Sequence, residues 1–93
     1  MHFLYRKVKC FIKIFKLQYF YIVMINKFAQ RLKFLREDRN LSMKQLSKQV
    51  DIGIASISRW ENGQTIVNAD QLIIFSKFFN VSVDYLLGLR DFD

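Results

Sequence analysis

The chain has 93 residues, of which 52% are hydrophobic and 25% are charged, and its formal net charge is +7. This length suits one domain, and a lone cysteine and a lone histidine exclude a disulfide scaffold and argue against a metal site. With no proline and only three glycines, the composition predicts a packed all-α domain, and the cysteine usage is typical of the reducing cytoplasm.

The positive charge is concentrated near the N-terminus. Residues 1–25 contain five Lys or Arg and no Asp or Glu, a net charge of +5, whereas residues 26–93 contain ten against eight, a net charge of +2. We therefore divide the chain into a basic aromatic extension, residues 1–25, and a domain, residues 26–93. Helical spacing in the extension predicts an apolar stripe and a separate basic face. The stripe comprises Val8, Phe11, Ile12, Phe15, Tyr19 and Ile22, and the basic face Lys9, Lys13 and Lys16.

The extension has three interpretations. Its longest uncharged run, residues 17–26, has ten residues against the roughly twenty that cross a bilayer, and no signal-peptide cleavage site follows. Either translation starts at Met24, or the extension is a helix that packs on the domain or on a second subunit, or it tethers the protein to a membrane or nonspecifically to DNA. Because no Pro or Gly occurs before Gly53, the extension is expected to be helical if it is made.

Two helices are predicted at the start of the domain. Asn26 can cap the first, and Asn40 suits its C-terminal end. Ser42 and Gln45 form a capping box that starts the second, because the serine oxygen meets the amide three residues on while the glutamine reaches back. The inner faces of these two helices comprise Phe28, Leu32, Leu35, Leu46 and Val50.

A turn and a third helix follow. The turn needs a residue with positive φ, which Gly53 adopts without steric penalty and Asp51 with a modest one. The third helix is predicted over residues 53–61, with Ile57 and Trp60 facing inward, and an Asn-Gly pair ends it.

Two more helices bring the predicted number to five. Asn68 and Gln71 form a capping-box-like start for the fourth helix. Ser82 caps a short last helix over residues 83–87, and Gly88 ends it. The fourth helix buries Leu72, Phe75 and Phe79.

Four stretches in this order carry a family resemblance: RLKFLRE, LSMKQLSKQV, SISRWENG and VSVDYLLG. Together they make residues 31–88, about two-thirds of the chain, similar to the helix-turn-helix domain of the Cro/C1 (XRE) family of phage and bacterial repressors. The resemblance implies a five-helix lambda-repressor-like fold that binds double-stranded DNA. It also implies a small repressor of phage or mobile-element type, which would bind a pseudo-palindromic operator as a homodimer with half-sites about 10 bp apart.

The third helix is expected to read bases. A major groove about 12 Å wide admits one α-helix, and a second helix can fix its angle on the phosphates. With Ile57 and Trp60 inward, the outward face of the third helix carries no acid. Arg59 can then bind guanine O6 and N7, while Ile54 and Ala55 can contact thymine methyl groups. The base-reading set is Ile54, Ala55, Ser58 and Arg59, although solvent or phosphate contact is the other interpretation of the arginine and serines.

A second set of residues is expected to contact phosphates. The start of the second helix offers free amide hydrogens and a positive dipole end. The segment after the third helix resembles the phosphate clamp of the family. The set comprises Ser42, Met43, Lys44, Ser56, Asn62, Gly63 and Gln64.

The resemblance also implies an internal ion pair between Arg36 and Glu61, which would tie the first helix to the third. The alternative is two surface charges worth under about 1 kcal/mol. Three positions depart from the family pattern: Asp51 replaces the usual turn glycine, Met43 a common glutamine, and Ile54 an often polar residue. These departures reduce polar contacts, and they favour modest affinity or an AT-rich site.

Two classes of function other than DNA binding differ in their support from the sequence. A protein-interaction or membrane-surface module, such as an antitoxin-like partner protein, could retain the same fold. An enzyme has no support, because no nucleophile–base set, paired catalytic carboxylates or phosphate-cradling Gly loop is visible, and no cofactor is indicated. Ile74 and Phe78 lie where the helical pattern expects polar residues, so they mark either a dimer face or additional core.

Overall fold

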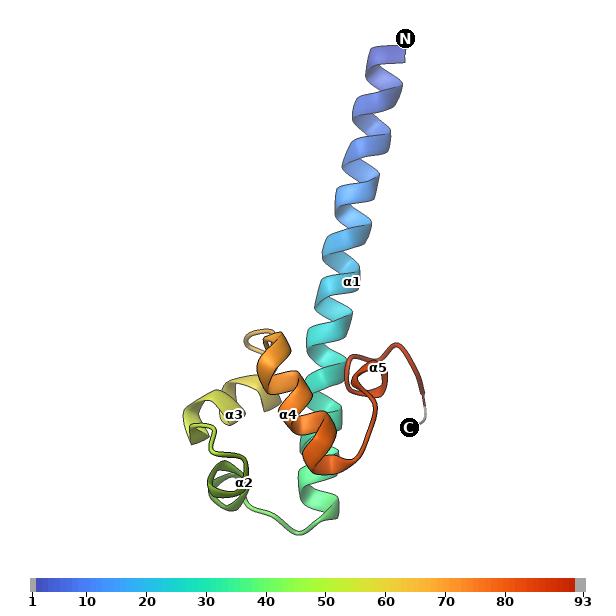
Figure 1. The fold of residues 1–93 in the computed structure, drawn as a ribbon. Helices are drawn as coiled ribbons and strands as arrows, with labels where there is room; N and C mark the ends of the chain where they lie inside the picture. The colour runs from blue at the N-terminus through green and yellow to red at the C-terminus, as the bar shows by residue number, and fades with distance from the viewer. Residues whose placement is uncertain (1, 92–93) are drawn as a thin grey trace.

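The computed structural model describes the backbone of residues 2–91 and the side chains of residues 16–91. This part of the chain is helical and contains no strand. The short helices gather around the C-terminal half of a long first helix, whose N-terminal half projects from the domain as a rod (Figure 1). The helices are α1 (His2–Asp38), α2 (Met43–Val50), α3 (Ile54–Glu61), α4 (Ala69–Phe79) and α5 (Val83–Leu86).

The first helix differs from its prediction. The expected cap at Asn26 is wrong, because α1 runs unbroken from His2 to Asp38. Extending an existing helix adds one hydrogen bond per residue without a new nucleation step, so one modest helix former does not stop it. At its other end α1 is followed by Asn40, whose φ of 56° is left-handed, as predicted for a helix C-terminus.

The predicted caps of the short helices are confirmed. The amide of Gln45 donates to Ser42 Oγ at 3.1 Å, and the Ser42 amide donates to Gln45 Oε1 at 2.8 Å. Asn68 accepts from the Gln71 amide at 3.1 Å, and a serine oxygen caps α5 in the same way. At the turn between α2 and α3, Asp51 takes the left-handed conformation with φ 56°. These local bonds set where each helix begins, and so they orient α2 and α3.

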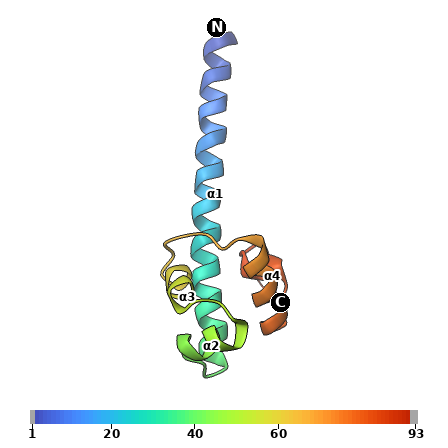
Figure 2. The ribbon, with the colours of Figure 1, turned by 60° about the vertical axis from the view of Figure 1, so that its left-hand side comes forward.

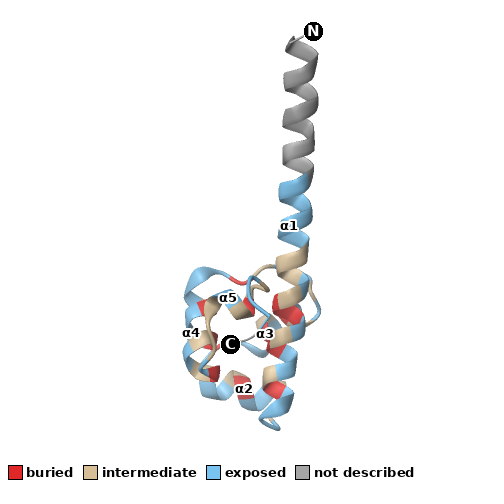
Figure 3. Cartoon of the chain, turned by 90° about the vertical axis from the view of Figure 1, so that its right-hand side faces the viewer, coloured by how far each residue is buried: buried red, intermediate tan, exposed pale blue. Residues whose placement is uncertain are grey.

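The core is aromatic at its centre. Phe28 of α1, Trp60 of α3 and Phe75 of α4 contact one another, with ring centroids 5.7 to 6.4 Å apart. Figure 2 shows α3 and α4 on different sides of the lower part of α1, and Figure 3 shows the buried residues on the sides of these helices that face one another. The described core comprises Phe28, Leu32, Leu46, Ile52, Ile57, Trp60, Val67, Leu72, Phe75, Phe79 and Leu86.

Arg31 of α1 is half-buried because it packs against α5 and the segment that follows it. Its guanidinium lies 4.4 Å from the centre of the Tyr85 ring and donates to the carbonyls of Tyr85 and Arg90. Nearby, Lys27 packs so closely on Gly88 that an added Cβ would lie 2.6 Å from the lysine Cγ. These contacts fasten the segment after α5 to α1.

Candidate nucleic-acid interface

Two buried side chains fix the orientation of α3. Ile57 has no exposed surface and Trp60 has 5%, and Leu46 of α2, also fully buried, belongs to the same core. The rest of α3 therefore faces away from the domain. The turn that precedes it is short because Asp51 reverses the chain directly after α2, and this brings the two helices together.

The residues predicted to read bases lie on the outer side of α3. Ile54 is 48% exposed, and Ala55 and Arg59 are also exposed. Ser58 and Ser56 are half-buried. The structure thus brings together, on one surface, an aliphatic side chain, a methyl group and a guanidinium.

The only acidic residue of α3 points into the domain. Arg36 donates from Nε to Glu61 Oε2 at 2.7 Å and from Nη2 to Oε1 at 2.9 Å. The Glu61 side chain is 2% exposed and that of Arg36 is 10% exposed. Arg36 also donates from Nη1 to the carbonyl of Leu41 at 2.7 Å. The hydrogen bond that Arg36 donates to Glu61 raises the pKa of Arg36 more than burial lowers it. The outer surface of α3 consequently carries a guanidinium and no free carboxylate.

The start of α2 presents backbone amides beside this surface. The first amides of any helix lack a partner within it. One of these amides, that of Gln45, donates its hydrogen bond to Ser42 Oγ. Lys44 is exposed, whereas the Met43 side chain packs against the core, so Met43 can offer a ligand only its backbone.

The segment after α3 is held by its own hydrogen bonds. Gly63 has a φ of 69°, a conformation that glycine adopts readily, and its amide donates to the carbonyl of Trp60 at 3.1 Å. The amide of Gln64 donates to the carbonyl of Arg59 at 3.0 Å, and Asn62 Nδ2 donates to Ser58 Oγ at 3.3 Å. The backbone amides of Gly63 and Gln64 therefore already have hydrogen-bond partners. A ligand at this segment would instead contact the exposed side chains of Asn62 and Gln64.

Sequence reasoning missed part of this surface. A polar hollow adjoins the outer side of α3, and Thr65 and Gln71 lie in its wall beside Arg59. Gln71 was assigned only to the start of α4, and Thr65 to no element. The spacing of residues carries no signal for this arrangement, because residues of α3, of the loop after it and of the start of α4 line the hollow together. The hollow is lined by Ser56, Arg59, Trp60, Thr65, Ile66, Asn68 and Gln71.

Comparison with known proteins identifies related sequences. A family model described as Helix-turn-helix matches residues 32–86. The HTH-type transcriptional activator BcrR of Enterococcus faecalis is 39% identical over 61 residues, covering 66% of this chain and 30% of BcrR. YobD of Bacillus subtilis, named an uncharacterized HTH-type transcriptional regulator, is 38% identical over 64 residues, covering 69% of this chain and 57% of YobD.

A third relative is the HTH-type transcriptional regulator ImmR of Bacillus subtilis, 34% identical over 60 residues, which cover 64% of this chain and 47% of ImmR. The chain thus spans less than two-thirds of the length of each of these relatives. The family match covers α2 and α3, which form the surface described above. The chain belongs to the helix-turn-helix family of the Cro/C1 (XRE) type.

Proposed function

We propose that the protein is a sequence-specific double-stranded DNA-binding transcriptional regulator that reads the major groove with α3. One observation carries this proposal: the outer side of α3 is exposed and holds Arg59, while its only acid, Glu61, is bonded to Arg36 inside the domain. A negatively charged duplex can therefore approach this helix without meeting a carboxylate on it. Family membership agrees with the expectation that the chain is not an enzyme.

Base recognition is assigned to four residues of α3. The exposed Arg59 is suited to donate two parallel hydrogen bonds to guanine O6 and N7. Ile54 and Ala55, both exposed near the start of the helix, are suited to contact thymine methyl groups. Ser58 lies beside them and is held by Asn62, so its hydroxyl is oriented for a base or a phosphate.

Phosphate contacts are assigned to the two ends of the motif. At the start of α2, the amides after Ser42 lie at the positive end of the helix dipole, and the exposed Lys44 adds a charge. After α3, Asn62 and Gln64 supply exposed amide side chains. Because phosphate contacts carry no sequence information, these residues should add affinity on every duplex.

We further propose that the protein acts as a homodimer on a pseudo-palindromic operator, with half-sites about 10 bp apart. Exposed apolar residues of α4 support a dimer face there: Ile73 is 46% exposed and Ile74 is 39% exposed. Phe78, named with Ile74 as part of this face, is half-buried against the core, with its ring 4.9 Å from that of Phe79. The face therefore centres on the two isoleucines.

Selection from random duplexes with purified protein, followed by titration of the selected site, tests the proposal. Arg59→Ala should relax preference at one guanine position by about 1–3 kcal/mol. Asn62→Ala should weaken binding to all duplexes alike, and Lys33→Ala, which removes an exposed lysine of α1, should change neither. Affinity should fall steeply with salt concentration.

Equal, sequence-blind losses for Arg59→Ala and Asn62→Ala would contradict the base-reading role of Arg59. Failure to bind any duplex at low salt would reject DNA binding itself. The resemblance to phage and bacterial repressors leads us to expect repression when the selected site is placed in a reporter promoter. Activation of that reporter would show that the regulator works in the opposite sense.

A further inference from the structure

The projecting part of α1 carries large apolar side chains that the domain does not cover. Among the described residues, five within one and a half turns of helix have between 46% and 66% of their surface exposed. Figure 3 shows this stretch as exposed, in contrast to the buried positions of the same helix within the domain. The five residues are Leu17, Tyr19, Phe20, Tyr21 and Ile22.

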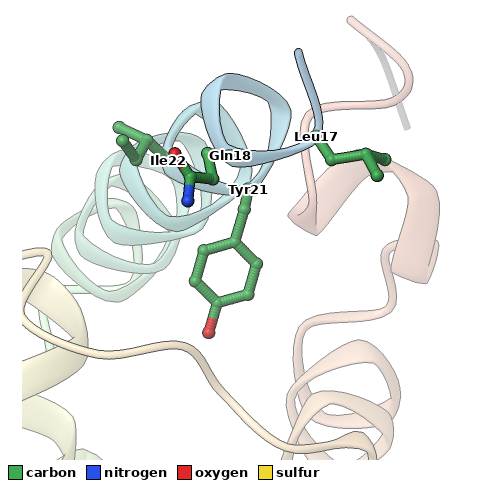
Figure 4. Close-up of a pocket in the computed structure, with 4 residues that line it drawn as sticks. All are labelled: Leu17, Gln18, Tyr21 and Ile22. Carbon is green, nitrogen blue, oxygen red and sulfur yellow. The ribbon is translucent and has the colours of Figure 1, made fainter. Parts of the chain in front are cut away.

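These side chains do not form one stripe directed at the domain. Figure 4 shows Leu17, Tyr21 and Ile22 pointing in different directions from α1, around a shallow hollow that Gln18 also lines. The interpretation of the extension as a helix packed on its own domain therefore fails for residues 17–22. A partner outside the domain is needed to remove this apolar surface from water.

Charge identifies the chemistry of that partner. Residues 1–25, all N-terminal to the core of the domain, carry a net charge of +5 and contain no acid. Lys16, the basic residue next to the apolar stretch, is exposed. A second copy of the helix would bring another +5 against this charge, so pairing of two extensions is opposed by repulsion. An anionic partner is favoured instead.

Two anionic surfaces differ in what they offer the aromatic side chains. The sides of duplex DNA present phosphates, but its bases are stacked inside. A phospholipid bilayer presents anionic headgroups directly above acyl chains, and aromatic side chains favour that boundary. Because Lys13 and Lys16 interrupt the apolar sequence, the helix is suited to lie in the boundary rather than to cross it. Within the residues that the structure describes, no helix has the length and hydropathy of a membrane span.

We propose that the projecting part of α1, centred on residues 16–22, docks on the surface of an anionic phospholipid bilayer. The apolar side chains enter the headgroup–acyl boundary, and the basic residues of the extension bind the anionic headgroups. Each basic residue near such a surface strengthens binding by about fivefold at physiological salt. This surface lies on a different part of the molecule from the outer side of α3, so the proposal does not depend on DNA binding.

Co-sedimentation of the full chain with vesicles tests this docking. The protein should bind vesicles that contain phosphatidylglycerol and remain in solution with vesicles of phosphatidylcholine alone, and high salt should release it. Phe20→Ala should lower the partition coefficient about three- to tenfold. Phe34→Ala is the matched control: it removes an exposed phenylalanine (60%, against 49% for Phe20) from the same helix, about 21 Å further along its axis, and should change nothing.

Three outcomes would overturn the proposal. The first is an absence of binding to phosphatidylglycerol vesicles, and the second is equal binding to neutral ones. The third is a Phe20→Ala protein that binds vesicles normally but loses a dimer seen by sedimentation velocity, which would assign the surface to a second copy. The melting temperature and the affinity for the selected duplex should be unchanged in both variants. These two measurements distinguish a loss of vesicle binding from a loss of folding or of DNA binding.

Discussion

Replacing Glu61 by alanine tests the interaction that turns the acid of α3 inward. The change removes both hydrogen bonds to Arg36, of 2.7 and 2.9 Å, from a pair whose side chains are 10% and 2% exposed. In the Glu61→Ala protein, Arg36 retains the hydrogen bond that it donates to the carbonyl of Leu41. Its Nη2 also lies 3.8 Å from Oε1 of Glu37, but the Glu37 side chain is 57% exposed. The charge of Arg36 would therefore stay largely buried with only part of its compensation.

The magnitude follows from this partial compensation. Breaking a buried ion pair by removing one partner lowers the free energy of unfolding by about 3–5 kcal/mol. The bond to Leu41 places this site near the lower end, about 3 kcal/mol, which is a large part of the stability of a small domain. For a domain of this size, the melting temperature should fall by roughly 12–24 °C.

Thermal and urea denaturation followed by circular dichroism measure this loss. Glu37→Ala is the control, because its carboxylate is exposed and its removal should change stability by under about 1 kcal/mol. The folded-state pKa of Arg36 is raised, so its contribution is complete below the unfolded pKa and is lost only as the pH rises through the folded pKa. Titration of Arg36 should therefore cause no pH dependence, near neutral pH, in the free energy of unfolding that the Glu61→Ala protein loses.

The reasoning would be refuted if Glu61→Ala melted within a few degrees of the unsubstituted protein, or no lower than Glu37→Ala. Site preference provides a second check. At a temperature where the Glu61→Ala protein is still folded, it should select the same duplex, because Glu61 lies inside the domain and Arg59 on its surface. A changed preference with unchanged stability would place Glu61 at the DNA instead.

Two further predictions concern the backbone. Asp51→Gly should raise the free energy of unfolding by about 0.5–1 kcal/mol in urea titration, because glycine adopts the φ of 56° without steric strain; a loss of stability would show that the aspartate side chain is needed there. Gly88→Ala should lower it by about 1–3 kcal/mol, because φ is 80° and the new Cβ would lie 2.6 Å from Lys27 Cγ. Gly53→Ala, with no atom within 4 Å of the new Cβ, should stay within about 0.5 kcal/mol, and equal effects at the two glycines would contradict the close approach at Gly88.

Local sequence signals predicted the short helices well. Each depends on residues a few positions apart, such as the serine at 42 whose oxygen accepts from the amide of Gln45. The inward positions of α3 and α4 followed from helical spacing alone, and Ile57, Trp60 and Phe75 are buried as expected. Where a local signal was weak, prediction failed: Asn26 can cap a helix, but α1 passes through it.

The sequence by itself determined the five helices, most of their ends and their inner faces, because caps, turns and apolar spacing act over one or two turns of chain. Tertiary structure decided which polar side chains leave the solvent. Arg31 lies on Tyr85, 54 residues away, and Arg36 binds Glu61, 25 residues away. No local pattern encodes such contacts, since they form only when packing of the core brings distant segments together. The same packing left residues 17–22 of α1 uncovered, although five of these six residues are apolar or aromatic.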